Sequence, residues 1–244
     1  MKAMIFAAGL GTRLKPLTDT MPKALVPLAG KSLLQWQVEK LRDAGITDII
    51  VNVHHFPEMI IEAIRENEGW GCNITVSDER DALLDTGGGL RKARPLLGNE
   101  PILACNVDIL SNIDLKKLLD RYKQTGVSQL VVSERATQRY LLFDDHKILR
   151  GWTNIATGEV KPASLCGADA AKLRPLAFGG MQILHADVLE RLDEMAEEKF
   201  SLIPFYLHIM ETTPLMAYVP EDYKMMDVGK IDQIEQAESF AESL

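Results

Sequence analysis

Short apolar runs alternate with segments of helical periodicity through the first half of the chain. Each apolar run is about one strand long, and each periodic segment repeats its apolar residues every three or four positions. The expected strands are 3–8, 48–53, 72–77, 101–106 and 128–133, and the expected helices are 32–44, 57–67, 87–94 and 112–124. Because strands that alternate with helices usually pair in parallel, this pattern predicts a mixed, mostly parallel sheet with helices on both faces.

After about residue 137 the pattern becomes less regular. Residues 140–152 predict a hairpin, and residues 153–174 show little periodicity. Further strands are expected at 176–184 and 215–219, and further helices at 186–197, 201–210 and from about 230. We therefore expect a single Rossmann-like α/β domain over 1–244, with its core in 1–137 and a small β insertion within 138–230.

A glycine-rich loop, AAGLGTRLKP at 7–16, follows the first expected strand. In an open α/β sheet, such a loop presents backbone N–H groups to anions at the carboxyl ends of the strands. Arg13 lies in the loop and Lys23 follows ten residues later. Arginine can bind two phosphate oxygens with its planar guanidinium, and lysine adds a mobile point charge. The pattern indicates a phosphate site, although each cation could also be an ordinary surface residue.

Two better-known phosphate motifs fit this chain poorly. The dinucleotide fingerprint needs a third glycine where this chain has Leu14, and the second expected strand ends in NVHH rather than in an acidic residue. The segment AGKS at 29–32 resembles the end of a P-loop, but the required earlier glycine is Leu25. We expect instead that Gly30 makes a turn and that Ser32 caps the next helix.

Charge and composition exclude several classes of partner. The chain has 27 Lys and Arg against 35 Asp and Glu, a net charge of −8, and no basic block, so nucleic acid is not an expected partner. No apolar run approaches the length of a membrane span, and the first run is too short for a signal peptide. The cysteines Cys72, Cys105 and Cys166 lack metal-ligand spacing, which favours reduced thiols and a cytoplasmic location.

Two aspartates are candidates for a metal site. Asp108 follows the apolar run PILACN, and Asp227 lies in the segment MMDVG near the other end of the chain. Either could simply stabilise a turn or cap a helix. Alternatively, an aspartate at the carboxyl end of a buried strand would face the same crevice as the glycine-rich loop. Mg²⁺ prefers hard oxygen ligands, commonly one or two carboxylates together with phosphates and water.

The segment G-L-G-T-R-L-K-P-L-T-x-x-x-P-K-x-L-x-P at 9–27 resembles the signature of the sugar-1-phosphate nucleotidylyltransferases. The resemblance continues in DTGGGLRKARPLLG at 85–98, CNVDIL at 105–110, AFGGMQIL at 177–184 and MMDVGK at 225–230. It implies the nucleotide-diphospho-sugar transferase fold and a Mg²⁺-dependent reaction. In that reaction a nucleoside triphosphate and a sugar 1-phosphate give an NDP-sugar and pyrophosphate.

The resemblance also implies a substrate pair, which we expect to be UTP and N-acetylmuramate 1-phosphate. The alternatives are guanylyl transfer to mannose or heptose 1-phosphate and cytidylyl transfer to phosphocholine. A non-catalytic nucleotide-binding subunit and an NAD-dependent oxidoreductase are further alternatives from different classes. The sequence leaves the base, the sugar and the oligomeric state open.

Individual site residues follow from the same resemblance. It assigns Asp108 and Asp227 to the metal, and Arg13 and Lys23 to the phosphates. Val107 and Met225 depart from the glycine and the aromatic residue that are common beside these aspartates. The nucleotide-binding residues that it implies are Ala7, Gly9, Gly11, Thr12, Gly87, Gly88 and Asn106.

The sugar side is expected in the second half of the chain. Gly180 matches a sugar-facing glycine of the family. Larger relatives carry Glu-Lys-Pro upstream of this glycine. The corresponding segment here is Glu159-Val160-Lys161-Pro162, with one residue inserted. Lys161 is therefore one candidate for the sugar phosphate, and Asn154 is an alternative sugar-binding residue. An ordinary loop lysine is an equally good interpretation of Lys161.

Overall fold

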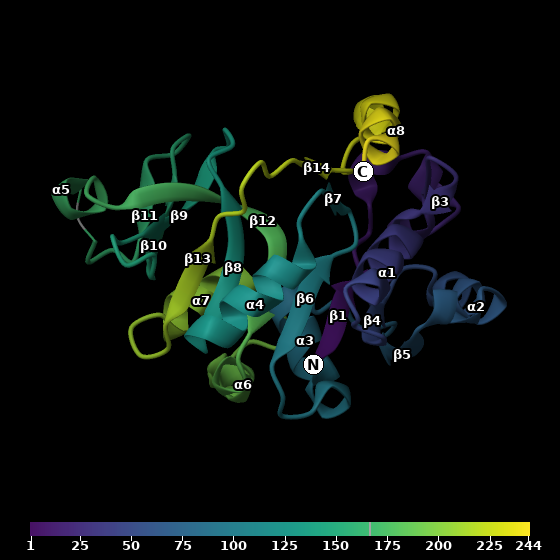
Figure 1. The fold of residues 1–244 in the computed structure, drawn as a ribbon, viewed down its shortest axis with the longest axis horizontal. Helices are drawn as coiled ribbons and strands as arrows, with labels where there is room; N and C mark the ends of the chain where they lie inside the picture. Colours follow the sequence, from purple (N-terminus) through teal and green to yellow (C-terminus); the bar gives the residue numbers. More distant parts are fainter. Residues whose placement is uncertain (166) are drawn as a thin grey trace.

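Strand β1 (Lys2–Phe6) lies near the centre of a ten-stranded mixed sheet (Figure 1). The computed structural model describes residues 1–165 and 167–244. On one side β1 pairs in parallel with β4 (Asp48–Val53), which pairs in parallel with β5 (Asn73–Asp78). On its other side β1 pairs in parallel with β6 (Ile102–Asn106). The chain therefore changes direction across the sheet at β1, which is where open α/β folds bind ligands.

The rest of the sheet is mostly antiparallel. The long strand β12 (Arg174–Leu184) pairs antiparallel with β6, with β8 (Ser128–Ser133) and with β9 (Arg139–Phe143). The insertion consists of β9, β10 (Leu149–Asn154) and β11 (Glu159–Lys161), and it extends away from the core (Figure 1). Strand β13 (Leu215–Tyr218) pairs in parallel with β8. One continuous sheet thus joins the core to the insertion.

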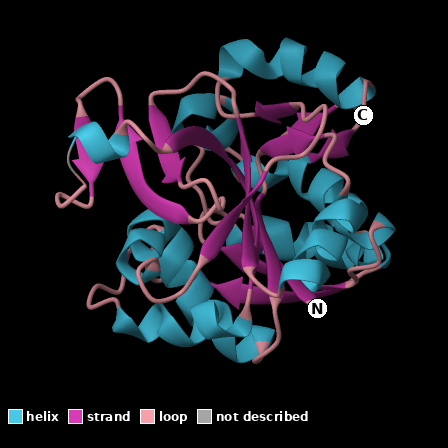
Figure 2. Ribbon diagram, turned by 60° about the vertical axis from the view of Figure 1, so that its left-hand side comes forward, coloured by secondary structure: helices cyan, strands magenta, loops and turns pink. Residues whose placement is uncertain are grey.

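Helices cover both faces of the sheet (Figure 2). Residues of β1 alternate between two cores: Ala3 and Ile5 belong to one, and Met4 and Phe6 to the other. The helices that bury side chains in the first core are α1 (Leu33–Asp43), α2 (Pro57–Glu66), α4 (Leu115–Thr125) and α8 (Ile234–Glu242). Those that do so in the second are α3 (Asp85–Leu97), α6 (Ala186–Glu190) and α7 (Leu202–Ile209). The predicted fold class is confirmed.

Local signals explain most of the element boundaries. The Ser32 hydroxyl accepts a hydrogen bond from the Gln35 N–H, so Ser32 caps α1 as predicted. Helix α4 begins at Leu115 rather than at 112, because the Asp114 carboxylate caps it by accepting hydrogen bonds from the Lys116 and Lys117 N–H groups. Helix α3 begins at Asp85, two residues before the predicted start.

Several short elements escaped the sequence analysis. They are β2 (Pro27–Leu28), β3 (Lys31–Ser32), β7 (Ile109–Ser111), β11, β14 (Met225–Asp227) and the single-turn helix α5 (Gly167–Ala170). Cys72 and Cys105 are free thiols, and Cys166 lies outside the described residues. Among the helices of 1–165 and 167–244, none combines the length and apolar character that crossing a membrane requires.

Candidate active site

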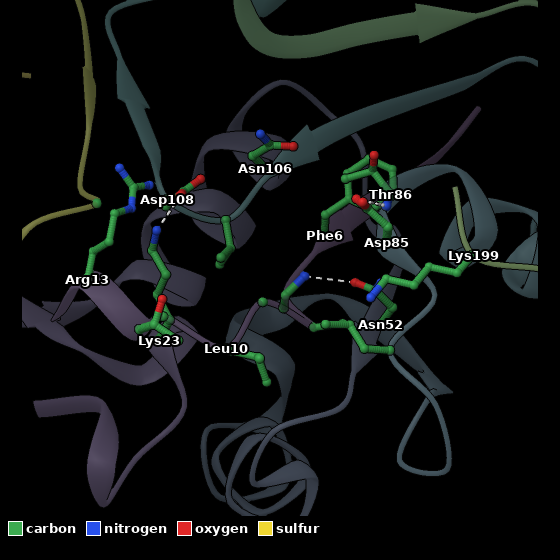
Figure 3. Close-up of a pocket in the computed structure, with 18 residues that line it drawn as sticks. Phe6, Leu10, Arg13, Lys23, Asn52, Asp85, Thr86, Asn106, Asp108 and Lys199 are labelled. Carbon is green, nitrogen blue, oxygen red and sulfur yellow. Dashed lines mark hydrogen bonds and ion pairs between the residues drawn. The ribbon is translucent and has the colours of Figure 1, made fainter. Parts of the chain in front are cut away.

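A cavity of about 440 Å³ opens at the carboxyl ends of β1 and β6 (Figure 3). Seven separate parts of the chain line it. Figure 3 shows Arg13, Lys23 and Asp108 together on one side, with Asp85, Thr86 and Lys199 across the cavity. The lining consists of residues 6–13, Lys23, Asn52, Leu83, Asp85, Thr86, residues 106–108, Lys199 and Gly229.

The glycine-rich loop has a compact shape that depends on Gly11. Its φ is +65°, and a Cβ there would lie 2.8 Å from the Thr18 methyl carbon and 3.0 Å from the Lys23 Cβ. The Gly11 carbonyl accepts hydrogen bonds from the Leu14 N–H and the Thr18 hydroxyl, both at 2.8 Å. Gly9, Gly11 and Thr12 all line the cavity, as does Ala7. The loop therefore lies at the cavity wall, as the sequence predicts for an anion-binding segment.

Lys23 and Asp108 form an ion pair inside the cavity. Lys23 is only 8% exposed, because it begins a 3₁₀ turn that packs beneath the loop. Asp108 follows β6, two residues after its last residue, Asn106. The ammonium group and the carboxylate thus meet at the sheet edge from which the glycine-rich loop begins.

The two short strands β7 and β14 bring Asp227 to the same place. In their antiparallel ladder Asp227 lies opposite Ile109, and the Val228 N–H donates to the Asp108 carbonyl at 2.9 Å. A Cβ on Gly229 would lie 2.7 Å from Asp227 Oδ1 and 2.9 Å from Arg13 Nη2, so the carboxylate and the guanidinium flank this glycine. The structure therefore brings Arg13, Lys23, Asp108 and Asp227 together.

The electrostatics of Asp227 follow from this arrangement. The carboxylate reaches solvent, but partial burial and the nearby Asp108 carboxylate raise its pKa. Lys23 and Arg13 oppose this shift. A divalent cation between two facing carboxylates would relieve their repulsion, so the donor set fits Mg²⁺. The described residues contain no group of three His, Cys, Asp or Glu side chains arranged for a metal, which leaves the other ligands to phosphate and water.

The two departures from the family pattern leave this geometry intact. Val107 is buried, and its N–H donates to the Phe6 carbonyl at 3.2 Å. It is not one of the non-glycine residues with positive φ in the described chain, so no glycine is needed at that position. Met225 is half-buried and pairs with Ser111 in the β7–β14 ladder.

A buried hydrogen-bond chain holds the base of the cavity, and sequence reasoning missed it. Asn52 Oδ1 accepts from the Ala7 N–H at 2.7 Å, and Asn52 Nδ2 donates to Glu79 Oε1 at 2.7 Å. Glu79 is fully buried, and burial raises its pKa. A Cβ on Gly89 would lie 2.6 Å from Glu79 Oε1, so α3 packs directly on this carboxyl group. The available signal was the position of Asn52 near the carboxyl end of a parallel strand.

Gly87 and Gly88 are predicted to contact the nucleotide, and the structure places them in a packing contact beside the cavity lining. Their N–H groups donate to the Phe200 carbonyl at 2.8 and 3.1 Å. A Cβ on Gly87 would lie 2.3 Å from the Phe200 ring, and one on Gly88 would lie 2.3 Å from the Glu198 carbonyl oxygen. These glycines let α3 pack against residues 198–200, and the cavity is lined instead by Asp85 and Thr86. This packing also brings Lys199, which was not predicted, to the cavity.

The predicted sugar-side residues divide into two groups. Gly180 has φ +71°, and a Cβ there would lie 3.2 Å from Asn106 Nδ2, so Gly180 borders the cavity residue Asn106. Asn154 Oδ1 instead accepts from the Ala156 N–H in the turn after β10. Lys161 pairs with Glu159 at 3.1 Å and lines a separate cavity. The structure therefore does not bring Asn154 or Lys161 to the cavity that contains Asp108.

This fold and this cluster of charges agree with comparisons to known proteins. The Nucleotidyl transferase family model matches residues 2–142, and the chain belongs to this family. It is 44% identical to N-acetylmuramate alpha-1-phosphate uridylyltransferase of Caulobacter vibrioides over 230 residues, which cover 90% of this chain and 88% of that protein.

A second relative and a solved structure extend the comparison. The protein of the same name from Neisseria meningitidis serogroup B is 46% identical over 114 residues. That match covers 47% of this chain and spans about half (49%) of the relative. Among solved structures, UDP-glucose pyrophosphorylase from Acinetobacter baumanii superposes with a TM-score of 0.77 at 18% identity, covering 97% of this chain and 91% of that one. At that identity the likeness shows the shared fold alone.

Proposed function

We propose that this protein transfers a uridylyl group from UTP to N-acetylmuramate 1-phosphate, giving UDP-N-acetylmuramate and pyrophosphate. The observation that carries the reaction class is the cluster of Arg13, Lys23, Asp108 and Asp227 at the edge of one cavity. The similarity to the Caulobacter protein along 90% of the chain supports the substrate pair. The reaction would take place in the cytoplasm and would return a cell-wall sugar to the nucleotide-sugar pool.

The chemistry requires alignment and charge neutralisation rather than a general base. An oxygen of the sugar phosphate, already ionised at neutral pH, attacks the α-phosphorus of UTP. A new phosphorus–oxygen bond forms while the bond from the α-phosphorus to the bridging β-oxygen breaks. The bonding electrons leave with pyrophosphate, and no proton has to be moved.

The residues have distinct tasks in this step. The buried Lys23 ammonium neutralises charge at the α-phosphate, and Arg13 with the loop N–H groups holds the departing β- and γ-phosphates. Ala7 and Asn52, which are hydrogen-bonded to each other and line the cavity, would face the base and ribose. Asp108 and Asp227 would hold Mg²⁺, which when bound supplies further charge neutralisation to the phosphates.

A pyrophosphate-release panel tests the proposal. UTP, GTP, CTP and dTTP are each combined with N-acetylmuramate, N-acetylglucosamine, mannose and glucose 1-phosphates in the presence of Mg²⁺. We expect the highest kcat/KM for UTP with N-acetylmuramate 1-phosphate. Preference for GTP with mannose 1-phosphate would replace the substrate pair while retaining the reaction class. Release of no pyrophosphate from any pair would contradict the reaction class itself.

A further inference from the structure

A second cavity, of about 540 Å³, lies between the β insertion and α7, and the reaction described above does not use it. The insertion supplies polar and aromatic side chains, and α7 with the residue before it supplies mainly apolar ones. The lining residues are Arg139, Trp152, Lys161 and Pro162 from the insertion, and Ser201, Ile203, Pro204, Leu207 and His208 from the α7 segment.

The two cavities share a wall. Ser201 lines the second cavity, and its hydroxyl donates to Asp85 Oδ2 at 2.7 Å. Asp85 lines the first cavity, and the next residue, Thr86, accepts a hydrogen bond at Oγ1 from the Leu202 N–H at 3.1 Å. These two hydrogen bonds place the second cavity directly beside the Asp85 and Thr86 side of the first.

The charges of the second cavity favour an anion. Lys161 already pairs with Glu159, and His208 Nε2 lies 3.1 Å from Glu194 Oε2. The Arg139 guanidinium, by contrast, makes no hydrogen bond or ion pair with any other side chain or backbone group in 1–165 and 167–244. Its planar array of donors matches a carboxylate, which can accept two hydrogen bonds from it.

The other walls favour an apolar group beside that anion. Ile203, Pro204 and Leu207 present aliphatic surface, and Trp152 presents an aromatic ring with the Lys161 ammonium 5.4 Å from its centre. A ligand that carries a carboxylate and a methyl group on one short branch would satisfy both kinds of wall. The lactyl ether of N-acetylmuramate is such a branch, and N-acetylglucosamine lacks it.

We propose that the second cavity binds the carboxylate-bearing side group of the acceptor sugar, and that Arg139 pairs with this carboxylate. This inference rests on the proposed function and adds to it a residue that determines acceptor specificity. Arg139 then distinguishes a carboxylated amino sugar from its uncarboxylated counterpart. The nucleotide and the reacting phosphate are bound elsewhere, by the residues around Asp108.

The test uses the full-length Arg139→Gln variant with UTP and Mg²⁺. For N-acetylmuramate 1-phosphate we expect kcat/KM to fall ~10- to 100-fold, mainly through KM, as for loss of a charge-assisted hydrogen bond. The KM for UTP and the inhibition constant of N-acetylglucosamine 1-phosphate should not change. Arg139→Lys should recover part of the loss. Arg150→Gln is the matched control, because Arg150 belongs to the same insertion but pairs with Asp144 and lines neither cavity.

The outcomes separate this inference from the proposed function. Turnover of N-acetylmuramate 1-phosphate by the unchanged protein tests the function, and the ratio between the two sugar phosphates in Arg139→Gln tests the subsite. Equal weakening of both sugar phosphates would overturn the inference, because Arg139 would then act on a group that they share. Unchanged kinetics in Arg139→Gln would overturn it as well.

Discussion

The Val228 main-chain N–H donates a hydrogen bond to the Asp108 carbonyl at 2.9 Å. This bond joins two segments that are far apart in the sequence, one following β6 and the other following β14. It holds Asp227, the neighbour of Val228, near Asp108 and beside Gly229, which lines the first cavity. The main chain therefore holds together the two segments that carry these carboxylates.

Asp227→Asn should abolish most of the activity while leaving the fold unchanged. The substitution keeps the shape of the side chain and removes the charge that faces Asp108, so kcat should fall by at least ~10²-fold, as when one preorganised electrostatic group is removed. Asp222→Asn is the matched control, since Asp222 is an exposed aspartate in the loop before β14 and is not among the charges that act on Asp227. Steady-state pyrophosphate release measures both variants. Near-normal kcat in Asp227→Asn would remove this residue from the mechanism.

Lys23→Ala should show a similar loss. The ammonium group is nearly enclosed by protein and pairs with Asp108. Removing it therefore leaves the cavity without this positive charge. We expect kcat/KM to fall by at least ~10²-fold. Lys15→Ala is the comparison, because Lys15 is exposed in the same loop region and pairs with Asp19 rather than with a cavity residue. A Lys23→Ala enzyme that unfolds cooperatively and still turns over at the normal rate would contradict the assignment.

These charged residues also show which parts of the site could be predicted from the sequence. The position of Asp108 at the edge of the sheet follows from the apolar run before it and from the rule that parallel strands end at one edge. The position of Asp227 does not, because β7 and β14 have three residues each and are too short to produce a periodic pattern. The ligand preference of Mg²⁺ and the resemblance to a family paired the two aspartates before the structure did, and neither predicted the ladder that brings them together.

The function of a glycine-rich segment is difficult to predict for a different physical reason. A missing side chain allows close approach of a ligand and close approach of another part of the protein equally well. At Gly11 the space is filled by Thr18 and Lys23, and at Gly87 it is filled by Phe200. The sequence predicted that both segments would lie near the cavity, but it could not distinguish a ligand contact from helix packing.

Gly87→Ala should therefore destabilise the protein. The new methyl group would lie 2.3 Å from the Phe200 ring, and relieving this overlap should lower the free energy of unfolding by ~1–3 kcal/mol. Gly158→Ala in the turn before β11 is not suitable as a control, because the φ of Gly158 is +73°. Gly167→Ala is the control: among the described residues, its new methyl group would meet no atom within 4 Å beyond its chain neighbours and its own helix backbone. This substitution should change the free energy of unfolding by less than ~0.5 kcal/mol. Urea denaturation compares the two variants. Equal stabilities would show that α3 can move away from residues 198–200 at no cost.

Glu79 should make stability depend on pH. Its pKa in the folded protein is raised above the ordinary value of 4.5 by burial, so the folded state binds this proton more tightly than the unfolded state does. The contribution of Glu79 is fully present below pH 4.5 and is lost as the pH rises through the folded pKa. Glu79→Gln removes this titration, so the stability of the natural protein should fall relative to that of the variant over this range. A difference in free energy of unfolding between the two proteins that stays constant at every pH would contradict this prediction.

The most direct test of the central claim is the affinity for Mn²⁺, used as a paramagnetic substitute for Mg²⁺, in the presence of a non-hydrolysable UTP analogue. The account predicts that the protein with the analogue binds Mn²⁺ more tightly than the analogue alone does. It also predicts that Asp108→Asn and Asp227→Asn each abolish this gain in an electron paramagnetic resonance titration. If either variant binds Mn²⁺ as tightly as the natural protein, the two carboxylates do not share a metal ion and the proposed site is wrong.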